Sequence, residues 1–208
     1  CGDLVEPAAQ SLSFALSELL DGNGLMCAAY LTHFRQLLAC WTRCSLLDRA
    51  ARFRAFDREG RDQFADLVRQ ALRLSRPDGT LVLGGGHSGQ WCADLWEAAS
   101  AQGGGRTNRK LARLVLPGRQ ARKKSRVRAR RLPKPSAYSE WGEVCVMRTA
   151  WSRQSPQFAC LFDDQRLRAE LTTAGRLLWS GDVTPRVSVD GQLLEYTSDW
   201  TELCWFTD

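Results

Sequence analysis

The residues best suited to acid–base chemistry are the two histidines, His33 and His87, because an imidazole changes its charge near neutral pH. His33 follows Tyr30 by three residues in a segment whose apolar residues recur at helical spacing, so one helical face would carry both side chains. A tyrosine hydroxyl and an imidazole can serve as acid and base in proton abstraction next to a carbonyl group. The alternative is a histidine that packs between helices and is satisfied by a hydrogen bond. Tyr30 and His33 are therefore the candidate catalytic residues.

Cysteines near His33 raise the question of a metal. Cys40 and Cys44 follow at positions i+7 and i+11 on the same helical face. A structural zinc site needs about four closely spaced ligands, and i+7 on a straight helix is too far for one ion. None of the eight cysteines forms a Cys-x-x-Cys pair, so we predict no metal site. A disulfide between neighbouring strands, for example Cys145 with Cys160, stays open, because sequence does not fix the distance between them.

The second histidine lies in a glycine-rich loop, where His87, Ser88 and Gln90 follow three glycines at 84–86. Glycines let the backbone approach a ligand closely, and loops often carry binding residues. These three residues are the candidate substrate-binding residues; the alternative is a surface loop whose glycines serve only the turn. The loop lacks the Lys-Ser/Thr of phosphate-binding loops, and the chain has no Gly-x-Ser-x-Gly sequence of serine hydrolases.

One segment makes the chain basic. The formal net charge is +6, but 13 Lys or Arg and no Asp or Glu lie between Arg106 and Lys134. The rest of the chain has 16 basic and 23 acidic residues, so the folded parts are expected to carry a net negative charge. The segment either holds a polyanion or is a solvated tether. It has no aromatic residues to stack on bases, so nucleic acid is not an expected partner.

The elements that would position these residues are helices first and strands afterwards. Helical periodicity predicts helices over 7–20, 25–42, 61–74 and 91–100, with a further short helix in the less regular segment 45–56. The third helix would bury Phe64, Leu67, Val68, Ala71, Leu72 and Leu74. The Arg-Pro-Asp-Gly sequence at 76–79 predicts a turn, and 81–83 a short extended piece.

From residue 141 onward, short apolar runs recur about ten residues apart, as in an antiparallel meander. Turn residues separate the runs at 163–164, 174–175, 181–182 and 190–191. Asp190-Gly191 is the strongest hairpin signal, because a two-residue turn with positive φ accepts Asp-Gly at little cost.

The sequence therefore predicts an α+β fold in three parts: a helical part at 1–102, a largely mobile basic linker at 103–140, and the start of an antiparallel β-sandwich at 141–208. No apolar run approaches the roughly 20 residues of a membrane-spanning helix, so no membrane span is predicted. The chain starts at Cys1 with no signal-peptide pattern. The thin core expected for each half favours a piece of a larger protein.

Several short motifs follow one another in an order that resembles a known family. They are Arg-Pro-Asp-Gly at 76–79, Leu-Val-Leu at 81–83 before the glycine-rich loop, Val-Cys-Val-Met-Arg-Thr-Ala-Trp at 144–151, Gly-Arg-Leu-Leu-Trp-Ser-Gly at 175–181, and Trp-x-x-x-Cys-Trp at 200–205. In this order they resemble the heparinase II/III-like polysaccharide lyases, which include alginate and heparin lyases. In that family an α/α toroid precedes an antiparallel β-sandwich. The resemblance covers most of 8–208 and implies a fragment holding a partial toroid-like helical part and a partial β-sandwich.

The resemblance implies β-elimination of an acidic, uronate-containing polysaccharide. A base removes the proton at C5, a neighbouring donor stabilises the carboxylate charge, and the glycosidic oxygen leaves with the help of an acid. Family members use Tyr, His and Asn or Arg from the toroid and a His from the sandwich, and some bind a metal there. They are often periplasmic or secreted. No export signal is visible here, and the sequence leaves both the compartment and the cofactor unknown.

The sequence departs from the family pattern in the sandwich. No His lies in 141–208, and Phe-Ala-Cys-Leu-Phe-Asp-Asp-Gln stands at 158–165, where active relatives carry a His-rich segment. Either that histidine has been lost or it lies beyond Asp208, so no catalytic residue is carried over, and this chain alone is expected to be inactive. The alternatives are a non-catalytic relative that serves as a scaffold and a polyanion-binding protein that uses the basic segment.

Overall fold

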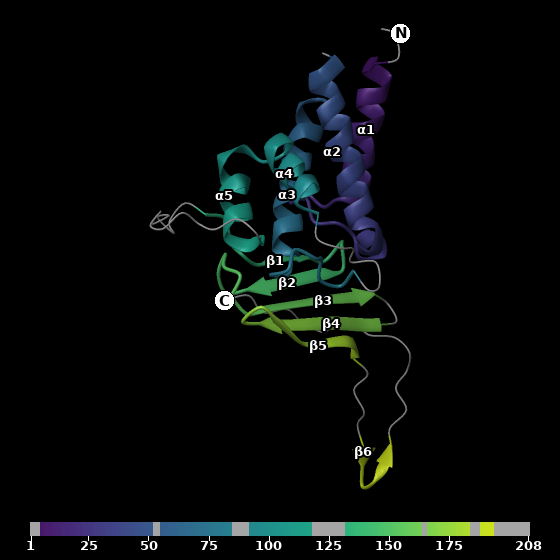
Figure 1. Ribbon diagram of the computed structural model, residues 1–208. Coiled ribbons are helices and arrows are strands. Elements are labelled where there is room, and N and C mark those ends of the chain that lie inside the picture. The colour runs from purple at the N-terminus through teal and green to yellow at the C-terminus, as the bar shows by residue number, and fades with distance from the viewer. Residues whose placement is uncertain are drawn as a thin grey trace.

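The computed structural model describes residues 5–51, 55–84, 92–117, 132–163, 166–183 and 188–193, which form helices followed by antiparallel strands, the predicted α+β arrangement (Figure 1). The helices are α1 (Val5–Leu19), the 3-10 helix η2 (Ala28–His33), α2 (Phe34–Ala51), α3 (Arg58–Arg73), α4 (Ala93–Gln102) and α5 (Gly105–Val115). The strands are β1 (Ala137–Ser139), β2 (Val144–Arg148), β3 (Gln157–Asp163), β4 (Arg166–Thr173), β5 (Arg176–Val183), β6 (Ser188–Val189) and β7 (Gln192–Leu193). Figure 1 shows the helices gathered on one side of the sheet.

Helix α3 is the centre of the helical part, since it contacts α1, α2, α4 and α5. It begins after Asp57, whose side chain accepts a hydrogen bond from the Gly60 N–H at 2.7 Å and so satisfies a free amide of the first turn. Every side chain predicted to be buried on this helix is buried. The predicted turn at 76–79 follows: the Gly79 N–H donates to the Arg76 carbonyl at 2.9 Å, and Gly79 has a φ of 86° that suits glycine.

The second helical segment differs from the prediction in where it starts and ends. Met26 pairs with Leu20 in a β-bridge, and the Asp21 carboxylate accepts the N–H groups of Asn23 and Leu25 at 2.8 and 2.7 Å. This tight turn delays the helix, which begins as η2 and becomes α2 only at Phe34. Helix α2 then runs to Ala51, so the residues from 45 to 51 continue it rather than start a separate helix.

Part of the predicted linker at 103–140 is a packed helix, which corrects that prediction. Helix α5 occupies Gly105–Val115 and buries Leu111, Ala112 and Val115. Asn108 is also buried, and its amide donates to the Ala65 carbonyl on α3 at 2.7 Å. The basic side chains of α5 face outward. Positions 108, 111, 112 and 115 form an amphipathic stripe, so the helix buries enough apolar surface to be ordered despite its charge.

The sheet is a meander in which β1 to β5 pair in sequence order, each antiparallel to the next. Ala174 and Gly175 close the β4–β5 hairpin with φ values of 46° and 79°, and Asp190 and Gly191 close the β6–β7 hairpin with 52° and 80°. These positive values confirm the two predicted hairpin turns. The predicted turn at 181–182 is wrong: Gly181 pairs with Ala169 and Asp182 with Arg168, inside strand β5.

Helices and sheet share one hydrophobic core. The same cluster of buried side chains joins Leu67 and Leu72 of α3 to Val144, Val146 and Ala159 of the sheet. The helical part and the first strands are therefore packed together rather than separated by a tether. The sheet face toward the helices carries Val144, Val146, Arg148, Gln157, Ala159, Glu170 and Thr172, all of them buried.

Candidate functional site

The predicted acid–base pair lies at the surface, near the boundary between helices and sheet. Tyr30 and His33 belong to η2, whose three residues per turn place positions i and i+3 on the same side. Both side chains are exposed, Tyr30 at 44%. The Ala28 N–H donates to the Gly142 carbonyl at 2.7 Å, which ties η2 to the turn before β2. His33 is therefore not the buried, packed histidine of the alternative interpretation, and it can meet a ligand.

The predicted substrate-binding residues His87, Ser88 and Gln90 lie outside the described residues. The segments on both sides of that loop are described. Leu81, Val82 and Leu83 are buried before it, and Cys92 is half-buried after it. The anchored ends of the loop thus fall at the helix–sheet boundary on one side and at the start of α4 on the other.

A groove of about 700 Å³ lies between α2 and α4, within the usual size range of small-molecule sites. Its walls are Arg35, Gln36, Ala39, Thr42, Arg43 and Leu46 from α2, and Cys92, Asp94, Leu95 and Ala98 from the start of α4. Arg35 stands two residues after His33 in the sequence, and Cys92 stands two residues after Gln90. The groove lining therefore lies close in sequence to both predicted clusters.

The charge of the groove suits an anion. Arg35 and Arg43 carry two positive charges against one from Asp94, and neither arginine forms an ion pair with another described residue. Arg35 is half-buried and Arg43 exposed. The Thr42 hydroxyl already donates its proton to the Leu38 carbonyl at 2.6 Å, so it is not available to donate to a ligand. The groove thus offers guanidinium donors that can bind a carboxylate with two parallel hydrogen bonds.

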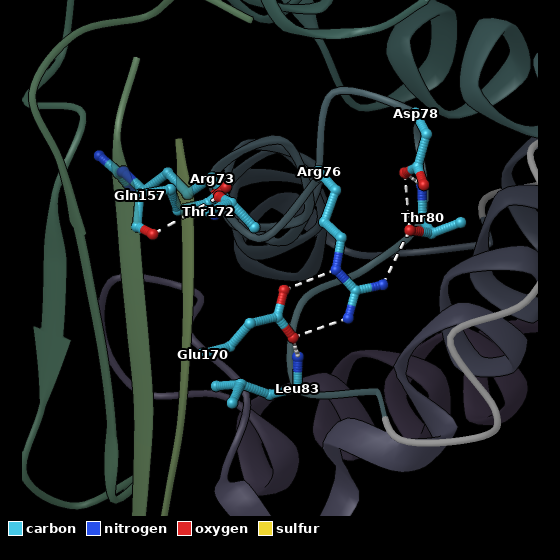
Figure 2. A network of polar contacts seen from close by, with 8 residues as sticks. All are labelled: Arg73, Arg76, Asp78, Thr80, Leu83, Gln157, Glu170 and Thr172. Atoms are coloured by element: carbon cyan, nitrogen blue, oxygen red, sulfur yellow. Dashed lines mark hydrogen bonds and ion pairs between the residues drawn. The ribbon is translucent and has the colours of Figure 1, made fainter. Parts of the chain in front are cut away.

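The most extensive polar network lies elsewhere, between the helices and β4 (Figure 2). The Glu170 carboxylate is 1% exposed and accepts Nε and Nη2 of Arg76 at 2.6 and 2.7 Å and the Leu83 N–H at 3.2 Å. Arg76 also donates to the Thr80 hydroxyl at 2.9 Å, and that hydroxyl donates to Asp78 at 2.7 Å. The hydrogen bonds that Arg76 donates to the Glu170 carboxylate raise the pKa of Arg76.

This network is an anchor rather than an acid–base group. The carboxylate of Glu170 accepts three hydrogen bonds from protein groups and is closed to solvent, so a ligand does not reach it. It holds the Arg76 turn and the segment that leads into the glycine-rich loop against the sheet. Leu83 has a φ of 60°, a left-handed conformation that costs energy for a bulky residue, and its N–H bond to Glu170 helps to hold it there.

A second set of contacts lies at the end of α3, where side chains of the sheet donate hydrogen bonds to carbonyl groups that have no partner within the helix. Gln157 donates to the Arg73 carbonyl at 2.7 Å, and Arg148 donates to the Leu72 carbonyl at 3.3 Å. The Arg73 guanidinium lies 5.6 Å from the centre of the Trp151 ring. Burial lowers the pKa of Arg73 and of Arg148 to about 10, so both stay charged at neutral pH. Cations at this helix end also complement the helix dipole.

Sequence reasoning missed the groove arginines and the anchor. The signal for Glu170 was its position: in β4 it stands on the same face as Arg168 and Thr172, whereas Ala169 and Leu171 form the other face. The arginine of the 76–79 turn was interpreted only as a turn residue. Arg35 and Arg43 carry no signal of their own, because single arginines on a helix usually face solvent.

A scan against protein-family models finds no matching family, and searches of curated proteins and of solved structures find no similar protein. Across the described residues, no three His, Cys, Asp or Glu side chains lie close enough to share a metal ion. None of the helices in these ranges has the length and apolar character needed to cross a bilayer.

Proposed function

We propose that this chain is part of a carbohydrate-active protein of the heparinase II/III-like kind, which acts on an acidic, uronate-containing polysaccharide by β-elimination. We further propose that the α2–α4 groove binds a carboxylate-bearing sugar chain. The observation that carries the proposal is the groove itself. It is lined by two guanidinium groups without described acidic partners, and one of them, Arg35, stands two residues after His33 of the exposed Tyr–His pair.

The sheet supports the β-sandwich part of the proposal. Its face away from the helices is largely apolar. Cys145 and Ala169 are buried there, and seven further apolar side chains are half-buried or exposed: Met147, Phe158, Cys160, Phe162, Leu167, Leu171 and Trp179. Met147 is 51% exposed and Trp179 is 43% exposed. A sandwich covers such a face with a second sheet, whereas a single-layer sheet usually turns polar residues to solvent.

The chemistry of the site fits the proposed reaction. Arg35 and Arg43 would neutralise the uronate carboxylate, which acidifies the C5 proton next to it. Tyr30 and His33 would supply the base that removes this proton and the acid that protonates the leaving glycosidic oxygen. Under this proposal, other catalytic residues of the family, such as the histidine of the sandwich, do not come from this chain.

Binding to this chain tests the groove. We expect uronate oligosaccharides to bind more tightly than neutral oligosaccharides of equal length, as measured by calorimetric titration. Arg35→Ala and Arg43→Ala should each weaken uronate binding roughly tenfold, the value of one charge-assisted hydrogen bond. Arg61→Ala is the matched control, because Arg61 is an exposed arginine on α3 outside the groove. Equal losses in all three variants, or equal affinity for neutral sugars, would refute the groove as the binding site.

The acid–base pair is tested separately. This test uses a form of the protein that catalyses β-elimination. In that form, His33→Gln and Tyr30→Phe should each lower kcat about 100-fold while leaving KM nearly unchanged. The readout is the ultraviolet absorbance of the unsaturated uronate product. Unchanged kcat in both variants would show that the proton transfers belong to other residues.

Polyanion binding without catalysis is the second candidate function, and α5 favours it. Arg106, Arg109, Lys110 and Arg113 of this helix are all exposed, so α5 presents a fixed basic surface. Replacing these four by Gln should reduce both the retention on a heparin column and the salt dependence of that retention. If retention is unchanged, α5 does not bind polyanions.

A further inference from the structure

Two cysteines face each other across neighbouring strands on the outer side of the sheet. Cys145 of β2 is the register partner of Cys160 of β3, so their side chains leave the sheet on the same face. The same row continues with Tyr138 of β1 on one side and Ala169 of β4 on the other. The meander therefore places two thiols side by side, although 15 positions separate them in sequence.

The hydrogen bonds on either side of the pair define its geometry. The Phe162 N–H donates to the Glu143 carbonyl at 3.1 Å, and the Thr149 N–H donates to the Pro156 carbonyl at 3.4 Å. Hydrogen-bonded and non-bonded pairs alternate along an antiparallel ladder, which makes Cys145 and Cys160 a hydrogen-bonded pair. Such pairs have Cα atoms about 5.5 Å apart, close to the commonest Cα separation in disulfides.

The surroundings of the two thiols differ. Cys145 is buried at 2% exposure, whereas Cys160 is half-buried. The stacked rings of Tyr138 and Phe162, 6.0 Å apart, lie on this face. The Cys160 thiol forms a hydrogen bond with Cys145, which lowers the pKa of Cys145 and raises that of Cys160. The two thiols are thus hydrogen-bonding partners, and Cys145 is the more acidic of the pair.

We propose that Cys145 and Cys160 form a redox modification site, a cross-strand dithiol that a low-molecular-weight disulfide such as glutathione disulfide converts reversibly to an intrachain disulfide. This site does not rest on the sugar-binding groove proposed above, although a second sheet of the proposed β-sandwich would cover the same face. The register already makes the two side chains neighbours, so closing the disulfide requires only a local approach of the two Cβ atoms.

The exchange balances in two steps. One cysteine thiolate attacks a sulfur of glutathione disulfide, the S–S bond of the reagent breaks, and one glutathione leaves as a thiolate that takes up a proton. The second cysteine, as a thiolate, then attacks the cysteine sulfur of the mixed disulfide, and the second glutathione leaves and is protonated. The protein loses two electrons and two protons, and glutathione disulfide gains them as two glutathione thiols.

The test is a titration of the whole chain in buffers of graded glutathione redox ratio, followed by alkylation, trypsin digestion and mass spectrometry. Trypsin cleaves after Arg148 and Arg153, so Cys145 and Cys160 fall in different peptides that only a disulfide can join. We expect the linked peptide to appear as the buffer becomes oxidising, with the loss of two alkylated cysteines, and to disappear after dithiothreitol. The exposed Cys40 serves as the internal control, because its glutathionylation reports that the oxidant was effective.

The outcomes are distinct. If Cys40 is glutathionylated while Cys145 and Cys160 stay fully alkylated, or if they link to other cysteines instead of each other, the proposal is wrong. The linked peptide should vanish in both Cys145→Ser and Cys160→Ser, and in Cys145→Ser the half-buried Cys160 should carry glutathione instead. Because the wild-type mapping alone decides the proposal, it stays testable even if a serine variant fails to fold.

Discussion

The buried ion pair between Arg76 and Glu170 should contribute strongly to the helix–sheet contact, and Glu170→Ala tests this. The substitution removes an acceptor of three hydrogen bonds, two from Arg76 and one from the Leu83 N–H. Breaking one side of a buried pair costs about 3–5 kcal/mol, since the remaining charge loses its partner. The Arg76 side chain is 17% exposed and can be partly hydrated, so we expect the lower end, about 3 kcal/mol.

Urea unfolding of the wild type and the variant measures this loss. With a slope of about 2 kcal/mol per molar urea, 3 kcal/mol lowers the midpoint by about 1.5 M. The control is the surface pair of Asp66 and Arg69, at 2.6 Å with both side chains about a third exposed, for which Asp66→Ala should cost less than about 1 kcal/mol. A Glu170→Ala loss no larger than that of the control would refute the reasoning. The double variant Arg76→Leu/Glu170→Leu should be more stable than Glu170→Ala, because it leaves no unpaired charge.

Four further predictions concern stability, each measured by urea or thermal unfolding. Gly24→Ala should cost more than about 1 kcal/mol, because the glycine has a φ of 79° and its new Cβ would lie 2.7 Å from the backbone of α3. Asp57→Ala should cost about 1 kcal/mol by removing the N-cap of α3. Burial raises the pKa of Asp66 above its ordinary 3.8. The stabilisation from protonated Asp66 is therefore complete below pH 3.8 and is lost as the pH rises through the raised pKa. Asp66→Asn should remove this loss of stability with rising pH. Oxidation of Cys145 and Cys160 should raise stability by up to about 3 kcal/mol, the entropic effect of closing a loop of about 15 residues.

Local signals predicted the elements whose pattern is unambiguous. Helix α3 has an apolar stripe on one face and a turn sequence after it, and both were found where predicted. The turns at 174–175 and 190–191 were predicted because Gly175 and Asp190-Gly191 stand between apolar runs and accept positive φ. In each case the information lies within a few residues, so no knowledge of the rest of the fold was needed.

Long-range pairing could not be read in this way. Glycine at position 181 looked like a turn residue, but its partner Ala169 draws it into a strand that extends to Val183. Arg76 and Glu170 are 94 positions apart, and the sequence around each residue contains no signal that the two side chains pair. The groove arginines depend on the packing of α4 beside α2, which sequence periodicity does not provide. Charge density also misled the interpretation of α5, because the basic residues obscured its buried stripe.

The two faces of the sheet show why side-chain alternation alone could not predict which face of β4 packs against the helices. A strand on a helical layer usually turns its apolar residues toward the helices, yet β4 directs Glu170 and Thr172 there and Ala169 and Leu171 away. The arrangement is stable because Glu170 accepts three hydrogen bonds, two from Arg76 and one from the Leu83 N–H. Glu170, Gln157 and Arg148 thus bond groups at the end of α3 and in the segment after it, while the apolar Leu171 of β4 lies on the opposite face. A sheet built in this way has hydrophobic surface to bury on the side away from its helices, which is the requirement that the proposed β-sandwich would meet.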